Sequence, residues 1–265
     1  MRTPVLSILS IVTVVALVVG AVAIYKAVRH AAANSCRVNG IGVTYTLEPD
    51  QATNATTIAA VGKRIGLPNH AVTIALAAAL QESKLHNLAH GDRDSLGLFQ
   101  QRPSQGWGTA SEVQDPAYAA TAFFTHLAKI DGWQTLPVTT AAQRVQRSSA
   151  PNAYAKWENE ARALARATTG EVVAAFTCRA TAPKASAIDP ALQSTMNAEL
   201  GPVDLAAVVL TARGWTVATW LVAHARRFGI NTISFAGERW TTSSGTWTRH
   251  SPAVDRVQIE RTPAA

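Results

Sequence analysis

Uncharged residues run without interruption from Pro4 to Tyr25. At about 1.5 Å per residue, a helix of roughly 22 residues reaches about 33 Å, which is enough to cross the hydrocarbon core of a bilayer. A cleavable signal peptide has a shorter apolar region, although the small residues at 31–33 would suit a peptidase. The pattern therefore predicts that residues 1–33 form an uncleaved transmembrane anchor.

Residues 34–180 alternate alanine-rich apolar runs with Gly, Pro and Asn, a pattern typical of helices separated by turns. Few strands are expected in this segment. The predicted helices cover residues 51–65, 69–83, 116–130, 139–147 and 153–168. The sequence therefore predicts a mostly helical domain over residues 34–180.

A change of composition marks the end of that domain. Residues 181–189 are mainly Ala, Thr, Pro, Lys and Ser, which favours a linker. Residues 190–265 then offer an apolar run at 205–210, a helix at 216–228, and strands near 232–236, 246–249 and 256–259. The expected fold class is mainly α: a helical domain after the anchor, followed by a small α+β domain of unknown role.

Four tryptophans lie close together in the C-terminal unit, at positions 215, 220, 240 and 247. Aromatic side chains are common in carbohydrate-binding and peptide-binding grooves, but they more often fill a core. The sequence leaves both interpretations open for these tryptophans.

The two cysteines, Cys36 and Cys178, bracket the helical domain. This placement predicts a single closing disulfide, with two unpaired buried thiols as the alternative. A bond that closes a loop of about 143 residues contributes at most roughly 5 kcal/mol in the chain-entropy model. A disulfide also places the body of the protein outside the cytoplasm.

The net charge is +7 at pH 7, and it is spread along the chain. Because no basic stripe with interleaved aromatic residues is present, nucleic-acid binding is not expected. His86, His90 and His126 lack the spacing of metal ligands, and no glycine-rich phosphate loop is visible. We therefore expect neither a metal ion nor a cofactor.

Glu82 stands at the end of a segment that is apolar on almost every side from Ala71 to Leu80. Such a segment is expected to be a buried central helix. A carboxyl group at its end is costly unless it opens into a cleft. Since glycoside cleavage needs an acid that protonates the leaving oxygen, Glu82 is a candidate catalytic residue.

A second motif follows at fixed distance. Glu82-Ser83 and then Gly97-Leu98-Phe99-Gln100 resemble the Glu-Ser and Gly-Leu-Met-Gln pair of soluble lytic transglycosylases and goose-type lysozymes. Gly91-Asp92-Arg93 also resembles the Gly-Asp-Arg of the goose-type enzymes. The resemblance covers residues 55–170, where Asp115-Pro116 opens an aromatic-bearing helix, and it implies a lysozyme-like helical domain that cleaves peptidoglycan.

The resemblance implies roles for several residues. Glu82 corresponds to the acid, and Tyr154 is similar to the tyrosine that hydrogen-bonds that acid, although the surrounding sequence departs from the usual Tyr-Asn-Ala-Gly. Trp107 is a candidate for stacking on a sugar ring, with packing of its loop as the alternative. The expected substrate-binding residues are Ser83, Gly97, Gln100, Gln101, Trp107 and Tyr154.

A hydrolase needs a second carboxylate, and Asp92 is the better candidate, ahead of Asp94. An acidic residue that goose-type enzymes place after their Gly-Leu-Met-Gln is replaced here by Gln101-Arg102, which favours a transglycosylase. Such an enzyme cuts the bond between N-acetylmuramic acid and N-acetylglucosamine with one protein carboxylate. The alternatives are a goose-type-like lysozyme and a non-catalytic wall-binding or scaffold protein of the cell envelope.

The expected partners are peptidoglycan strands and the cytoplasmic membrane, the latter through residues 4–25. Protein partners are not indicated. The expected topology is a single-pass protein of the cell membrane with its body on the extracytoplasmic side. Lys26 and Arg29 oppose this orientation under the positive-inside rule, and the substrate and the disulfide favour it.

Overall fold

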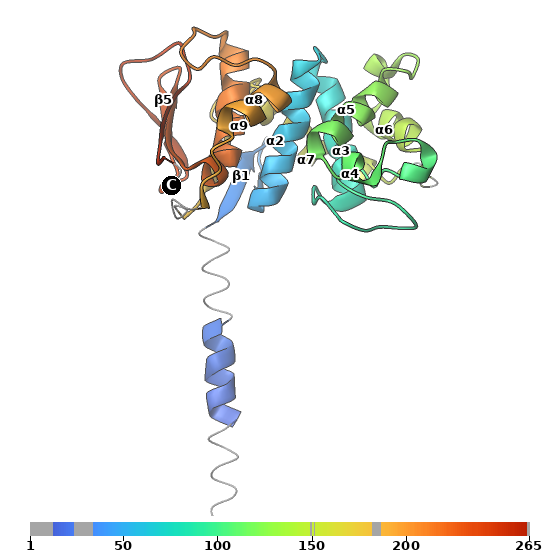
Figure 1. Cartoon of the computed structure of the whole chain (residues 1–265), viewed down its shortest axis with the longest axis horizontal. Helices are drawn as coiled ribbons and strands as arrows, with labels where there is room; N and C mark the ends of the chain where they lie inside the picture. The colour runs from blue at the N-terminus through green and yellow to red at the C-terminus, as the bar shows by residue number, and fades with distance from the viewer. Residues whose placement is uncertain (1–12, 24–33, 149, 151, 182–186, 264–265) are drawn as a thin grey trace, which may run out of the picture.

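The computed structural model describes residues 13–23, 34–148, 150, 152–181 and 187–263 (Figure 1). Helices make up 49% of the structure and strands 15%, in two antiparallel sheets with seven strands. The expectation of a mainly α fold is therefore wrong. The strands are four to six residues long and pair with distant segments, so local periodicity carried little signal for them.

The prediction of a single-pass membrane anchor is also corrected. Within the predicted span of residues 4–25, the structure describes only residues 13–23, which are helical. Spanning a bilayer takes about 20 apolar residues. No helix in the described part of the chain has the length and apolarity to do so.

A three-stranded sheet joins the two ends of the segment that was expected to be helical. β1 (Ser35–Asn39) lies between β2 (Thr44–Leu47) and β3 (Phe176–Arg179), and both neighbours are antiparallel to it. In this register Cys36 lies directly opposite Cys178. The two form a disulfide, which confirms the predicted bond.

α3 (Asn69–Ser83) is the central helix, as predicted from its apolar sequence, and its residues from Ala71 to Leu80 are buried. α2 (Pro49–Arg64) packs beside it and begins with a capping box formed by Glu48 and Gln51. The remaining helices of this unit are α4 (Ala110–Val113), α5 (Pro116–Leu127), α6 (Val138–Gln146) and α7 (Glu158–Thr168), with short 3₁₀ turns η1 (Pro103–Gln105), η2 (Trp133–Thr135) and η3 (Ala155–Trp157).

The C-terminal unit combines two helices with the second sheet. α8 (Leu192–Leu200) and the longer α9 (Thr211–Phe228) precede strands in the order β6-β5-β4-β7. These are β4 (Ile230–Phe235), β5 (Glu238–Thr241), β6 (Thr246–Arg249) and β7 (Gln258–Arg261). Gly229 ends α9 with a φ of +65°, a conformation that glycine adopts without strain.

The two units share one hydrophobic core. Figure 1 shows α2 between α8 and α9 on one side and α3 on the other, and α2 packs against all three. Trp215, Trp220 and Trp240 are almost completely buried. The indole of Trp240 donates to the Cys178 carbonyl oxygen at 3.1 Å, and that of Trp247 donates to the Phe176 carbonyl oxygen at 2.9 Å. Trp240 and Trp247 therefore join the C-terminal sheet to β3, and Trp215 and Trp220 are core residues of α9.

Candidate active site

The half-buried Glu82 is the penultimate residue of α3, and its carboxyl group is held by a tyrosine. The hydroxyl of Tyr154 donates to Oε1 of Glu82 at 2.7 Å. Burial raises the pKa of Tyr154 well above its usual value, and the charge of Glu82 raises it further, so the phenol keeps its proton. Among the described residues, Oε2 of Glu82 has no hydrogen-bond partner.

The direction of Glu82 is set by the way α3 ends. Lys84 and Leu85 both have positive φ, 56° and 64°, and turn the chain sharply after Ser83. Two amides from α2 bind the carbonyl oxygens exposed by this turn: Gln51 donates to Lys84 at 2.8 Å and Asn54 to Leu85 at 2.7 Å. α2 therefore caps the C-terminus of the central helix beside the candidate acid.

The Gly97–Gln100 loop is fastened to the same helix end. The hydroxyl of Ser83, which is buried, donates to the Leu98 carbonyl oxygen at 2.7 Å. Gln146 of α6 donates to the next carbonyl oxygen, that of Phe99, at 2.8 Å. Ser83 therefore connects the two halves of the motif instead of facing an open cleft.

The backbone conformation and the close packing at position 97 both require a glycine. Its φ is +76°, and a Cβ at this position would lie 2.3 Å from the Val113 carbonyl oxygen. Its amide donates to the Leu88 carbonyl oxygen at 2.8 Å in a short antiparallel bridge. The glycine of the motif therefore allows this loop to pack closely against the end of α4.

The two glutamines after Phe99 have different surroundings. Gln100 is partly exposed, and its side-chain Nε2 lies 3.3 Å from the Gly97 carbonyl oxygen. A Cβ at Gly91 would overlap the Gln100 side chain, so these two residues pack directly. Gln101 is buried and donates to the Ala119 carbonyl oxygen at 3.1 Å, which places it in the packing between the loop and α5.

The two candidate second carboxylates lie in the loop after α3. The Asp92 side chain is 94% exposed, and its ion pair, to Nε of Arg93 at 4.0 Å, lies in solvent. Asp94 accepts from the Ser104 amide at 2.8 Å and from Arg102 at 2.7 Å. These bonds, chiefly the one from the Ser104 backbone, lower the pKa of Asp94 below its usual range. Asp94 therefore fastens the loop to η1.

Trp107 packs against a histidine. Its ring centroid lies 4.0 Å from that of His126, with an angle of 36° between the planes. The indole is partly buried and lies against the core. One of its faces is thus occupied by α5, which fits the packing alternative.

A neighbouring cluster around Trp157 was not predicted from the sequence. The indole of Trp157, at the start of α7, donates to Oε1 of Gln81 at 2.9 Å, and Nζ of Lys84 lies 3.6 Å from the centroid of a Trp157 ring. Burial raises the pKa of Glu160 on the same helix, against the opposing charge of Lys84. Only the position of Trp157, one helix turn after Tyr154, could have drawn attention to it.

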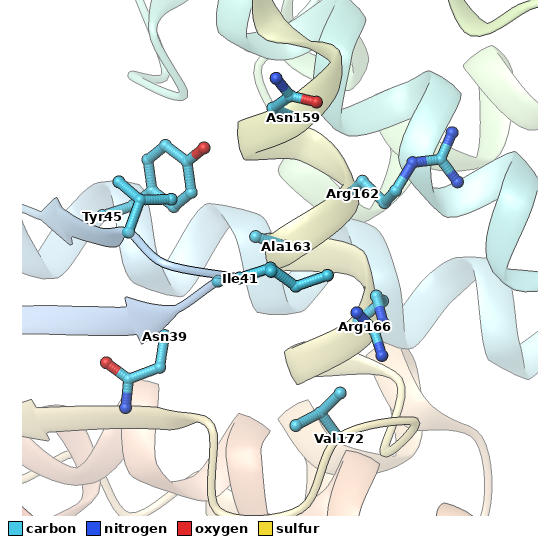
Figure 2. A pocket seen from close by; sticks show the side chains of 10 residues that line it. Asn39, Ile41, Tyr45, Asn159, Arg162, Ala163, Arg166 and Val172 are labelled. Atoms are coloured by element: carbon cyan, nitrogen blue, oxygen red, sulfur yellow. The ribbon is translucent and has the colours of Figure 1, made fainter.

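A cavity of about 430 Å³ lies elsewhere, between α7 and the turn that joins β1 and β2 (Figure 2). Its lining includes Ile41, Tyr45, Arg162 and Arg166. The two arginines already form ion pairs, with Glu158 at 2.8 Å and with Glu171 at 2.7 Å. None of the Glu82 site residues lines this cavity.

One group of described side chains has the ligand types of a metal site: Glu48, Asp50 and His86, whose ligand atoms lie within 4.8 Å of one another. His86 and Asp50 already pair at 2.8 Å, and Glu48 takes part in the capping box of α2. All three are at least partly exposed. Existing contacts account for this arrangement without an ion.

The arrangement at the end of α3 provides one carboxyl group whose Oε1 is held by a neutral phenol and whose Oε2 has no hydrogen-bond partner among the described residues. A group of this kind can give a proton to a leaving oxygen and later take one back. Neither the protein-family models nor the curated protein sequences compared with the chain match it.

Proposed function

We propose that this chain cleaves the glycan strands of peptidoglycan as a lytic transglycosylase, with Glu82 as general acid and then general base. The contact that carries the proposal is the 2.7 Å hydrogen bond from Tyr154 to Glu82, made across 72 positions of sequence. The resemblance of Glu82-Ser83 and Gly97 to Gln100 to lytic transglycosylases and goose-type lysozymes implies that Glu82 is the acid. Tyr154 is similar to the tyrosine that binds this acid in those enzymes, although its surrounding sequence departs from theirs.

In the first step, protonated Glu82 gives its proton to the glycosidic oxygen as the bond from that oxygen to C1 of N-acetylmuramic acid breaks. Positive charge develops at C1 and is stabilised by the carbonyl oxygen of the sugar's own acetamido group. Tyr154 donates to the carboxylate that remains, and this bond is stronger when its acceptor is charged. The tyrosine therefore favours the state that follows proton transfer.

In the second step, the 6-hydroxyl of the same sugar attacks C1 while the Glu82 carboxylate takes the hydroxyl proton. The product is a 1,6-anhydro end, and Glu82 is again protonated. Water is neither consumed nor released. One protein carboxylate is sufficient for both proton transfers.

The surroundings of the other carboxylates favour this reaction over hydrolysis. A hydrolase would need a second carboxylate to position water or to attack C1. The Asp92 side chain lies in solvent, and Asp94 is engaged by Arg102 and Ser104. Hydrolysis therefore stands as the second possibility, and glycan binding without cleavage as the third.

The proposal is tested by incubating the full chain with purified peptidoglycan and analysing the released muropeptides by mass spectrometry. The Glu82→Gln variant is assayed in parallel, since it keeps the size of the side chain and an acceptor for Tyr154 but cannot transfer the proton. Asp92→Asn is the matched control for an exposed carboxylate. We expect anhydro-muropeptides from the wild type and from Asp92→Asn, and none from Glu82→Gln.

Other outcomes identify the alternatives. Reducing-end products that disappear in Asp92→Asn would make the chain a lysozyme-like hydrolase. Binding to peptidoglycan with no products in any variant would favour the scaffold. Full activity in a folded Glu82→Gln variant would remove Glu82 from the mechanism.

A further inference from the structure

A second cavity, of about 710 Å³, lies where the two units meet, far from the candidate acid. Its walls come from the end of α2, the start of α3, the segment after α7, the end of α8 and the start of α9. In Figure 1 these helices lie next to one another around α2. The cavity therefore exists only because the C-terminal unit packs on the N-terminal unit.

Three cations line this cavity: Lys63, Arg64 and Arg213. The guanidinium of Arg213 and the aliphatic stem of Arg64 both approach the end of α8, while Nη2 of Arg64 donates to Oγ1 of Thr121 on α5 at 3.3 Å. Nη2 of Arg213 donates to the Leu200 carbonyl oxygen at 2.6 Å, and Cγ of Arg64 lies 3.3 Å from the position of a Cβ on Gly201. Lys63 donates to the Leu67 carbonyl oxygen at 3.0 Å and to Oδ1 of Asn69 at 3.2 Å.

None of the three cations has an ion-pair partner among the described carboxylates. Glu171 also lines the cavity, but its Oε1 pairs with Arg166 at 2.7 Å and its Oε2 accepts from the Asn69 side chain at 3.0 Å. Burial lowers the pKa of Lys63 and of Arg213, because both charges lose solvent without gaining a carboxylate. An anion in the cavity would supply the missing countercharge.

Two helix ends add to the positive potential. α3 begins at the cavity with Asn69, and α9 begins there with Ala212 and Arg213. Neither helix has a side-chain cap, so the first amides of each stay available. Gly170 allows the close approach, since a Cβ there would lie 2.2 Å from the Ala212 carbonyl oxygen.

We propose that this cavity binds a phosphoryl group, held by Lys63, Arg64 and Arg213. Three positive charges exceed what a single carboxylate neutralises, whereas a phosphate carries up to two negative charges and several acceptor oxygens. Arginine side chains and helix amides both match the oxygens of a phosphate. The exposed apolar residues Pro202 and Leu210 at the same cavity would contact the carbon skeleton of a phosphate ester.

The cavity is separate from the proposed catalytic site. Asn69 and Glu82 lie at opposite ends of α3, which at about 1.5 Å per residue places them roughly 20 Å apart. Phosphate binding therefore does not depend on glycan cleavage. A Glu82→Gln variant is expected to bind phosphate like the wild type, so a failure of either proposal can be recognised by itself.

The test is calorimetric titration of the full chain with inorganic phosphate at low ionic strength. Arg64→Gln and Arg213→Gln each remove one charge from the cavity, and Arg226→Gln on the exposed surface of α9 is the matched control. We expect saturable binding that each cavity variant weakens by roughly tenfold or more, and that the control leaves unchanged. Because Arg213 is partly buried, folding of each variant is first checked by circular dichroism.

Further titrations distinguish the sources of a phosphoryl group. Binding of dimethyl phosphate as well as inorganic phosphate would indicate the diester of a polymer, and binding of inorganic phosphate alone would indicate free phosphate or a monoester. Either result supports the proposal. Absence of saturable binding, equal binding by acetate, or unchanged affinity in the folded Arg64→Gln variant would overturn it.

Discussion

The Ser83 hydroxyl donates to the Leu98 carbonyl oxygen at 2.7 Å and so joins the end of α3 to the loop that follows it. The same hydroxyl lies 3.1 Å from the Ala79 carbonyl oxygen inside the helix. The residue beside the candidate acid therefore has a structural role that its sequence motif does not reveal. It fixes the distance between Glu82 and the Gly97–Gln100 loop.

Replacing Tyr154 by phenylalanine tests the support of the acid. The variant removes the donor to Glu82 and leaves the ring in the core, so we expect glycan cleavage to fall by about 10- to 100-fold. The free energy of unfolding should fall by only about 1 kcal/mol, the usual cost of one hydrogen bond. Initial rates of peptidoglycan solubilisation and urea denaturation measure the two effects. Tyr45→Phe is the control, because Tyr45 lines the cavity between α7 and the turn that joins β1 and β2. Equal rates in both variants would contradict the role of Tyr154.

Alanine substitutions at two glycines with nearly equal φ distinguish the cost of backbone strain from the cost of steric overlap. Gly97 has φ +76° and a carbonyl oxygen 2.3 Å from its Cβ position, whereas Gly106 has φ +79° and nothing within 4 Å. We expect Gly97→Ala to lower the free energy of unfolding by more than about 3 kcal/mol and Gly106→Ala by about 1 kcal/mol. Thermal unfolding of both variants checks the difference. Similar losses would show that the loop moves away from α4 at little cost.

The disulfide is expected to stabilise the whole body, because it closes a loop of 142 positions. Replacing both cysteines by serine should lower the free energy of unfolding by about 2–5 kcal/mol. Urea denaturation of the wild type with and without reductant, beside the double variant, provides the measurement. Reductant should affect the wild type and leave the double variant unchanged; an equal effect on both would exclude the bond as its cause.

The burial of His224 is expected to make the free energy of unfolding depend on pH. Burial lowers the pKa of His224 from its usual 6.5 to about 3, and Arg227 adds to the effect, while the hydrogen bond to the Trp220 carbonyl oxygen opposes it. Between these two values the unfolded chain binds more protons than the folded one. The free energy of unfolding therefore falls as the pH drops through this window, by at most about 1.4 kcal/mol per pH unit.

His224→Gln should make this dependence shallower between pH 6.5 and about 5, which lies above the ordinary pKa of Asp and Glu. Urea denaturation at several pH values measures the slope for the wild type and the variant. His90→Gln is the control, because the His90 side chain is solvent-exposed. A slope that both variants leave unchanged would show that His224 does not cause it.

The sequence by itself determined the central helix and the position of Glu82. α3 was predicted over residues 69–83 and found over Asn69–Ser83, because an unbroken apolar run between two turn signals is a local property. The disulfide followed from the placement of two cysteines and is confirmed. The pairing of Tyr154 with Glu82 was expected only through the family resemblance, and the geometry places the two in contact.

The tertiary structure decided the rest. β1 and β3 are four or five residues long and lie at opposite ends of the N-terminal unit, so their pairing has no local signal. The packing of the second sheet on β3 decided that Trp240 is a core residue, because its burial depends on contacts with that distant strand. The cationic cavity likewise depends on side chains that are far apart in the sequence, such as Lys63 and Arg213, which are 150 positions apart. Periodicity in sequence reports which face of a segment is buried, whereas only packing decides what that face meets.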